Sequence, residues 1–126
     1  MSVNSISRKA ALVLSTLALL SLPIGMLAAR AHTQTYQTNV SIHFDKKADE
    51  IWGHLGTSSF CQEGRSVQVF KDGSSVGTVV SEHAGMWSIP AGGAGNYHAV
   101  AAQSHSTGYD HDHTCLEGTS TTLSLS

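Results

Sequence analysis

Basic side chains are scarce in this sequence of 126 residues, which contains seven Lys and Arg against nine Asp and Glu. Three of the seven, Arg8, Lys9 and Arg30, precede residue 32. From residue 32 onward four basic residues stand against nine acidic ones, a formal charge of minus five. Nucleic-acid binding requires a basic surface that neutralises phosphates. We therefore expect no nucleic-acid partner.

The sequence also lacks the motifs that indicate hydrolases and transferases. Serines are abundant, but there is no nucleophile-elbow pattern, no His-Glu-x-x-His and no paired acidic motif. The only two cysteines, Cys61 and Cys115, are expected to be bonded to each other, so no thiolate remains for catalysis. We predict that the protein is not an enzyme.

An uncharged segment, Ala10–Ala29, follows directly on two basic residues and is typical of a secretory signal peptide. The stretch Ala29-Arg30-Ala31 fits the small-x-small rule for cleavage. We expect cleavage after Ala31, which assigns residues 1–31 to the signal peptide and makes His32 the first residue of the mature chain. Cleavage after Ala29 is the competing prediction.

A retained membrane anchor is the alternative for the same segment, since its length could just span a bilayer. Pro23 and the small residues before Arg30 argue against it, so we expect no permanent membrane span after cleavage. No cysteine lies near the cut, which excludes a form anchored to lipid through a lipobox cysteine. We therefore predict a secreted or cell-envelope protein.

Export determines the state expected for Cys61 and Cys115, because disulfides persist in oxidising compartments. A bridge between them closes a loop of about 54 residues, for which the chain-entropy estimate is roughly 4 kcal/mol. That is a large share of the roughly 5 to 10 kcal/mol expected for a domain of this size. The fold is therefore expected to depend on the bridge.

Strands are the expected elements beyond residue 31, because that part is rich in Gly, Ser and Thr and nearly free of long amphipathic runs. Alternating or β-branched runs bounded by turn signals predict seven strands, at residues 40–44, 50–56, 65–71, 76–80, 86–89, 97–101 and 121–125. Such spacing is typical of a two-sheet sandwich. We predict an all-β, seven-stranded sandwich over residues 40–126, a flexible segment 32–39, and one long surface loop at 103–114.

A longer pattern of spaced residues runs through these strands. Its members are Ile51, Gly53, Leu55, Cys61, Arg65, Val67, Val69, Phe70, Val76, Gly77, Thr78, Gly85, Trp87, Ile89, Gly95, Tyr97 and Ala99. In this pattern the sequence resembles the prealbumin-like or carboxypeptidase-regulatory-like β-sandwich repeat of bacterial secreted proteins, over residues 51–125. The resemblance implies an Ig-like sandwich, a second cysteine just before the last strand, which is Cys115 here, and no catalytic residues.

The inward positions of the predicted strands supply a core. Trp87 offers the largest block of apolar area, worth roughly 2 to 3 kcal/mol if fully buried. Tyr97 can bury its ring while its hydroxyl binds a backbone group. The residues that we expect in the core are Val67, Val69, Trp87, Ile89, Tyr97 and Ala99.

Histidines and aspartates gather in the predicted loop, at His105, Asp110, His111, Asp112 and His113. Neutral imidazole binds zinc or copper, and histidines at i and i+2 of an extended chain project to one side. The sequence therefore allows a metal site here, completed by His98 or His83 if the fold brings them near; the alternative is a solvated loop that binds no metal.

His43, His54 and His98 are expected to face solvent, because they alternate with apolar neighbours.

These observations favour an exported, non-catalytic β-sandwich with a structural, adhesive or ligand-binding role. We expect a monomer whose partner is an extracellular protein or glycan, and no cofactor apart from the possible zinc or copper. The alternative function is extracellular transition-metal binding by residues 105–113. A small inhibitor or toxin-like effector is a third class, which no residue selects.

Overall fold

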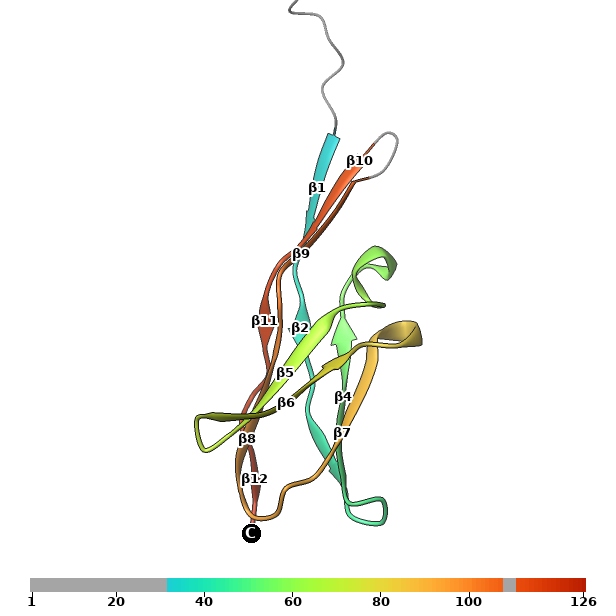
Figure 1. The fold of residues 1–126 in the computed structure, drawn as a ribbon. Helices are drawn as coiled ribbons and strands as arrows, with labels where there is room; N and C mark the ends of the chain where they lie inside the picture. The colour runs from blue at the N-terminus through green and yellow to red at the C-terminus, as the bar shows by residue number, and fades with distance from the viewer. Residues whose placement is uncertain (1–31, 108–110) are drawn as a thin grey trace, which may run out of the picture. The chain divides into compact units, whose positions relative to one another are not determined.

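The computed structural model describes residues 32–107 and 111–126, which form strands joined by turns and two short 3-10 helices, η3 (Ser59–Cys61) and η4 (His83–Gly85) (Figure 1). The predicted leader, with both cleavage points, lies outside the described residues, as does Asp110. The prediction of a mostly β protein with a disulfide between Cys61 and Cys115 is confirmed. Over the described ranges, no helix has the length and apolar character needed to cross a membrane.

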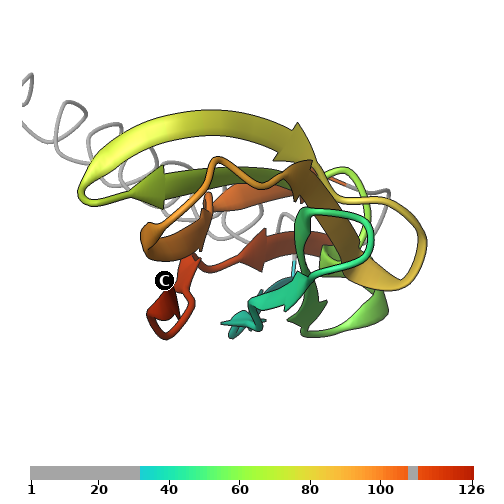
Figure 2. The ribbon, with the colours of Figure 1, turned by 90° about the horizontal axis from the view of Figure 1, so that it is seen from below.

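Two sheets make up what we call the body. The first has the order β11-β8-β5-β6, with β12 also paired to β8, and its strands are β5 (Ser66–Lys71), β6 (Ser74–Val80), β8 (Gly95–Ala101), β11 (Gly118–Thr119) and β12 (Leu123–Leu125). In the second, β4 pairs with all the others, and its strands are β2 (Asn39–Val40), β3 (His43–Asp45), β4 (Glu50–Gly56) and β7 (Met86–Pro90). The two sheets are seen from below in Figure 2.

The core of the body lies between these sheets and follows the period of two expected for half-buried strands. In β4, Ile51, Gly53 and Leu55 are buried while the residues between them are half exposed. Of the six core candidates, Val67, Val69, Tyr97 and Ala99 are fully buried, Trp87 is 3% exposed, and Ile89 is half-buried against the cluster. The Tyr97 hydroxyl donates to the Gly93 carbonyl oxygen at 2.7 Å, so the ring is buried with its polar group paired.

Gly53 makes the close approach of Trp87 possible. The two residues are cross-strand partners on β4 and β7, and a Cβ at Gly53 would overlap the Trp87 ring and the Ser41 carbonyl oxygen. We predict that Gly53→Ala lowers the free energy of unfolding by about 2 to 3 kcal/mol, because the core must shift to admit the methyl group. Urea unfolding followed by tryptophan fluorescence measures this loss.

Gly56 on the same strand is the matched control. A Cβ there would meet only Asn39 atoms at 3.6 Å, an ordinary contact distance. Gly56→Ala is therefore expected to change stability by less than about 1 kcal/mol. Equal losses in the two variants would contradict the steric explanation.

A third sheet, which we call the arm, extends beyond the body at one end (Figure 1). Its central strand β10 (His111–Cys115) pairs in parallel with β1 (His32–Tyr36) and antiparallel with β9 (Ser104–Thr107). Two predictions are wrong here. Residues 32–39 are not a flexible tail, since β1 is paired along its length, and residues 103–114 include two strands instead of forming one loop.

The described residues contain twelve strands, so the expected seven-strand count is wrong. Each predicted strand has a counterpart, but residues 40–44 are divided between β2 and β3, which lie end to end along β4. β11 is two residues long, and β9 and β10 contain no hydrophobic residue apart from Cys115. Hydrophobic alternation cannot reveal strands of this kind, which are defined mainly by backbone pairing.

Candidate functional site

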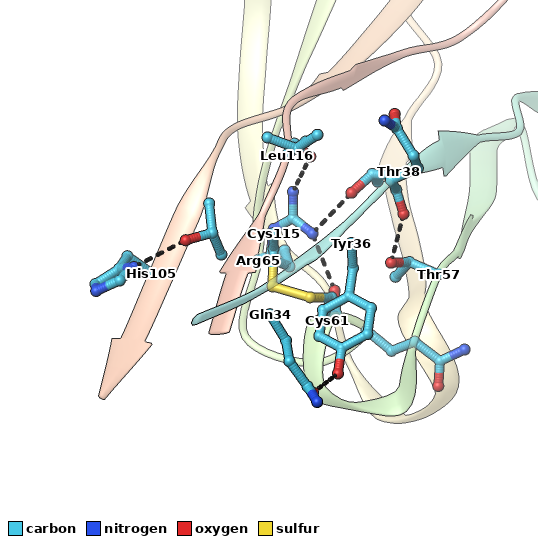
Figure 3. Close-up of a disulfide and its surroundings, with 12 residues drawn as sticks. Gln34, Tyr36, Thr38, Thr57, Cys61, Arg65, His105, Cys115 and Leu116 are labelled. Atoms are coloured by element: carbon cyan, nitrogen blue, oxygen red, sulfur yellow. Dashed lines mark hydrogen bonds between the residues drawn. A yellow bond between two sulfur atoms is a disulfide. The ribbon is translucent and has the colours of Figure 1, made fainter. Parts of the chain in front are cut away.

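The junction of arm and body is held by the disulfide and by Arg65 (Figure 3). Cys61 ends η3, Cys115 ends β10, and their Cα atoms are 5.6 Å apart. Arg65 is only 2% exposed and lies beside the bridge. The covalent bond therefore joins the base of the arm to the segment that leads into β5.

All five N–H donors of the Arg65 guanidinium are used. Nε and Nη2 donate to the Ala102 carbonyl oxygen at 3.1 and 2.7 Å, and Nη2 also donates to that of Leu116 at 3.1 Å. Nη1 donates to the Cys61 carbonyl oxygen at 3.1 Å and to Thr38 Oγ1 at 3.2 Å. One side chain thus connects the chain after β8, the chain after β10, η3 and the approach to β2.

Every acceptor around Arg65 is a neutral oxygen. Burial disfavours the charged form, and this desolvation lowers the pKa of Arg65 below its usual value. The carbonyl dipoles compensate for the lost water. The arrangement is structural, because every donor is occupied and none is left to bind a ligand.

The four predicted metal residues that the structure describes, His105, His111, Asp112 and His113, do not converge on one site. His105 is the cross-strand partner of Thr114, and the two side chains are 3.1 Å apart between Nδ1 and Oγ1. Because successive side chains of a strand alternate, His105 and Asp112 project from one face of the arm, whereas His111 and His113 project from the other. In residues 32–107 and 111–126, no three His, Cys, Asp or Glu are placed to hold a metal ion together.

His98 and His83, which the sequence offered as further ligands of this metal site, belong to other elements than β9 and β10. The His98 ring stacks on Phe70 of β5 with centroids 4.8 Å apart, and His83 begins η4. His43 is exposed, while His54 and His98 are half-buried; His98 packs against its cross-strand partner. All three histidines alternate along β3, β4 and β8 with residues that are more buried, so they lie on the outward side of these strands.

The face of the arm that carries His113 is aromatic. The His113 ring stacks on Phe60 with centroids 4.4 Å apart and planes inclined by 11°, and it lies 5.8 Å from the Tyr36 ring. Phe60 is 63% exposed, although its ring covers the imidazole. The Tyr36 hydroxyl donates to Gln34 Oε1 on the same strand. Nδ1 of His113 is buried and has no hydrogen-bond partner in the described part of the chain.

The outer face of the β3-β4-β7 sheet carries a second group of side chains that could bind a ligand. Trp52 of β4 is paired in register with His43 of β3 on one side and Ser88 of β7 on the other. The His43 and Trp52 rings are 4.6 Å apart between centroids. Trp52 therefore lies between His43 and Ser88 across three neighbouring strands, and the His43 imidazole covers one side of its ring.

A cavity of about 270 Å³ opens beside Trp52, and we call it the groove. Its lining includes Met86, which is 40% exposed, and three acidic residues, Asp45, Glu50 and Glu82, but no Lys or Arg. The Asp45 carboxylate accepts backbone N–H bonds from Lys47 and Ala48 at 2.9 and 3.2 Å, which shape the turn before β4. Glu50 and Glu82 remain to act on a ligand.

Sequence reasoning missed the burial of Arg65 and the position of the half-buried Trp52 beside acidic residues. The only sequence signal for Arg65 was its place four residues after Cys61, in the pattern Cys61-x-x-x-Arg65. The acidic residues of the groove come from three separate segments, so no local motif indicates them.

Comparison of the chain with protein-family models, with curated proteins and with solved structures gives no match. The resemblance to prealbumin-like domains therefore stays a prediction.

Proposed function

We propose that this protein is an exported, non-catalytic domain with an Ig-like, prealbumin-like β-sandwich fold, which binds a basic segment of an extracellular protein partner in the groove. The composition of the groove is the main support for this proposal. It combines the half-buried Trp52 ring with the carboxylates of Glu50 and Glu82 and has no basic lining residue. A negative aromatic cleft attracts ammonium and guanidinium groups through cation–π and charge-assisted hydrogen bonds.

The charge of the whole domain supports a cationic ligand. From residue 32 onward the formal charge is minus five, which favours encounter with a basic partner. A glycan would use the same aromatic ring but would gain less from carboxylates, since its hydroxyls are uncharged. The disulfide supports the export part of the proposal, because such bridges persist outside the cytosol.

An oligoarginine peptide is the probe for the groove. We expect the mature protein to bind it at low ionic strength, and Trp52→Ala and Glu82→Gln each to weaken binding about tenfold, which corresponds to about 1.4 kcal/mol. Isothermal calorimetry with a neutral oligosaccharide as a parallel titrant measures both ligand classes.

Glu63→Gln is the matched control, because it removes the same charge from an exposed residue that does not line the groove. It should leave peptide affinity within about twofold, as expected for a screened surface charge. Equal weakening by Glu63→Gln and Glu82→Gln would mean that overall charge alone attracts the peptide. Binding of the oligosaccharide in place of the peptide would assign the groove to a glycan.

A further inference from the structure

We propose that removal of the leader after Ala31 creates a copper(II) site on the arm, formed by the α-amino group and imidazole of His32 together with the imidazole of His111. The proposal rests on the export and cleavage that are part of the proposed function, and it is independent of the groove. Of the residues in the sequence prediction it keeps only His111 as a ligand, and His32 of β1 takes the place of His105, His113 and the two aspartates.

Strand register brings the two histidines together. β1 and β10 are parallel, and His32 is directly paired with His111. In-register neighbours on adjacent strands project to the same face, with backbones about 4.8 Å apart. Both residues are exposed, so their rings are free to turn toward a shared ion.

Cleavage supplies the ligand that the side chains lack. No three metal-binding side chains meet within the described ranges, and two imidazoles alone hold a metal weakly. The nitrogen of His32 is a peptide nitrogen in the precursor and a primary amine in the chain that begins there. Amine and imidazole of one residue can close a chelate ring on one ion, and His111 then adds a third nitrogen.

The donor set selects copper. Cu(II) binds nitrogen ligands most tightly among the divalent first-row metals and accepts the planar arrangement that three such donors offer. The carboxylate of Asp112 projects from the opposite face of β10, as shown by its pairing with Thr107, so no oxygen donor from this strand competes. Ca²⁺ and Mg²⁺, which require oxygen ligands, are disfavoured.

The surroundings hold the site in place. His113 lies two residues from His111 on the same face, with ring centroids 6.0 Å apart in an edge-on arrangement. Stacking on Phe60 fixes the His113 ring as one wall of the site. Below it, Cys115 is bonded to Cys61, so the strand that carries His111 is tied to the body.

The test uses the full chain produced in a bacterial host that exports it, with the processed protein then purified. Intact mass and N-terminal sequencing identify the first residue before any titration. Calorimetry with copper(II) alone, in a buffer that does not bind metals, is expected to show one ion per chain. Electron paramagnetic resonance should show coupling to nitrogen. His32→Ala and His111→Ala should each weaken copper binding at least about 100-fold. Loss of a residue that only positions a ligand weakens metal binding less than this.

His105→Ala is the matched control, because it removes an imidazole from the other face of the same sheet and should leave affinity unchanged. The uncleaved full chain should bind as weakly as His32→Ala. Unchanged affinity in His111→Ala, or equal affinity in the uncleaved chain, would overturn the site. A mature chain that begins elsewhere than His32 would also overturn it while leaving peptide binding in the groove intact.

Discussion

Replacing Arg65 with methionine is expected to lower the free energy of unfolding by about 3 to 5 kcal/mol. Methionine retains the unbranched stem but removes all five donors. The carbonyl oxygens of Cys61, Ala102 and Leu116 and the hydroxyl of Thr38 then lose their partner. A buried charge can often be exchanged for an apolar residue at little cost when its partners change too. Here three partners are backbone carbonyls, which no substitution can remove.

Urea unfolding of the oxidised protein, followed by circular dichroism, measures the effect. Lys71→Met is the matched control, because Lys71 Nζ also donates to a backbone carbonyl, that of Gly92 at 2.7 Å, but this bond is exposed to solvent. Water can replace that bond, so we expect a loss below about 1 kcal/mol. If Arg65→Met costs no more than Lys71→Met, the guanidinium does not hold the junction together.

Reduction of the disulfide is the second change with a large expected effect. The bridge spans 54 residues, and opening a loop of that length should cost roughly 4 kcal/mol. A domain of this size has about 5 to 10 kcal/mol in total. We therefore expect reduction, or Cys61→Ser with Cys115→Ser, to leave the mature protein largely unfolded at physiological temperature.

Far-UV and near-UV circular dichroism with and without reductant measures this change. The near-UV signal of Trp87, which is packed in the core, should be lost together with the strand signal. The oxidised protein, in which Cys61 and Cys115 are bonded, is the control and should retain both the near-UV and the far-UV signal at the same temperature. Spectra that reductant does not alter would show that the body folds without the bridge.

The strands of the body could be predicted because their side chains report which face is buried. β4 and β5 alternate between the core and the outer face, and Val67, Val69, Ile51 and Leu55 are buried as that pattern requires. The turn between β5 and β6 could also be predicted, because the pair Asp72-Gly73 is typical of a hairpin turn, and both residues have positive φ angles, of 49° and 84°. Local chemistry and burial agree at these positions.

The arm could not be predicted, because its strands carry little apolar area. His111–Cys115 is polar up to its last residue, and it is a strand because β1 and β9 satisfy its backbone groups. The directions of the predicted metal residues could not be predicted for the same reason. Once the segment is a hairpin, His105 and His113 project from opposite faces, whereas a loop would have left their directions open.

The sequence by itself determined that this chain is β-rich, that Cys61 and Cys115 pair, and that the part beyond residue 31 is acidic. These properties follow from the composition of the chain and from the alternation of residues within short segments. Both can be read without knowing which segments are in contact. Only the tertiary structure decided that Arg65 is buried among carbonyl oxygens, that His32 lies beside His111, and that Trp52 borders an acidic groove. Each of these depends on contacts between segments far apart in the chain, and backbone pairing establishes such contacts only when the whole domain folds.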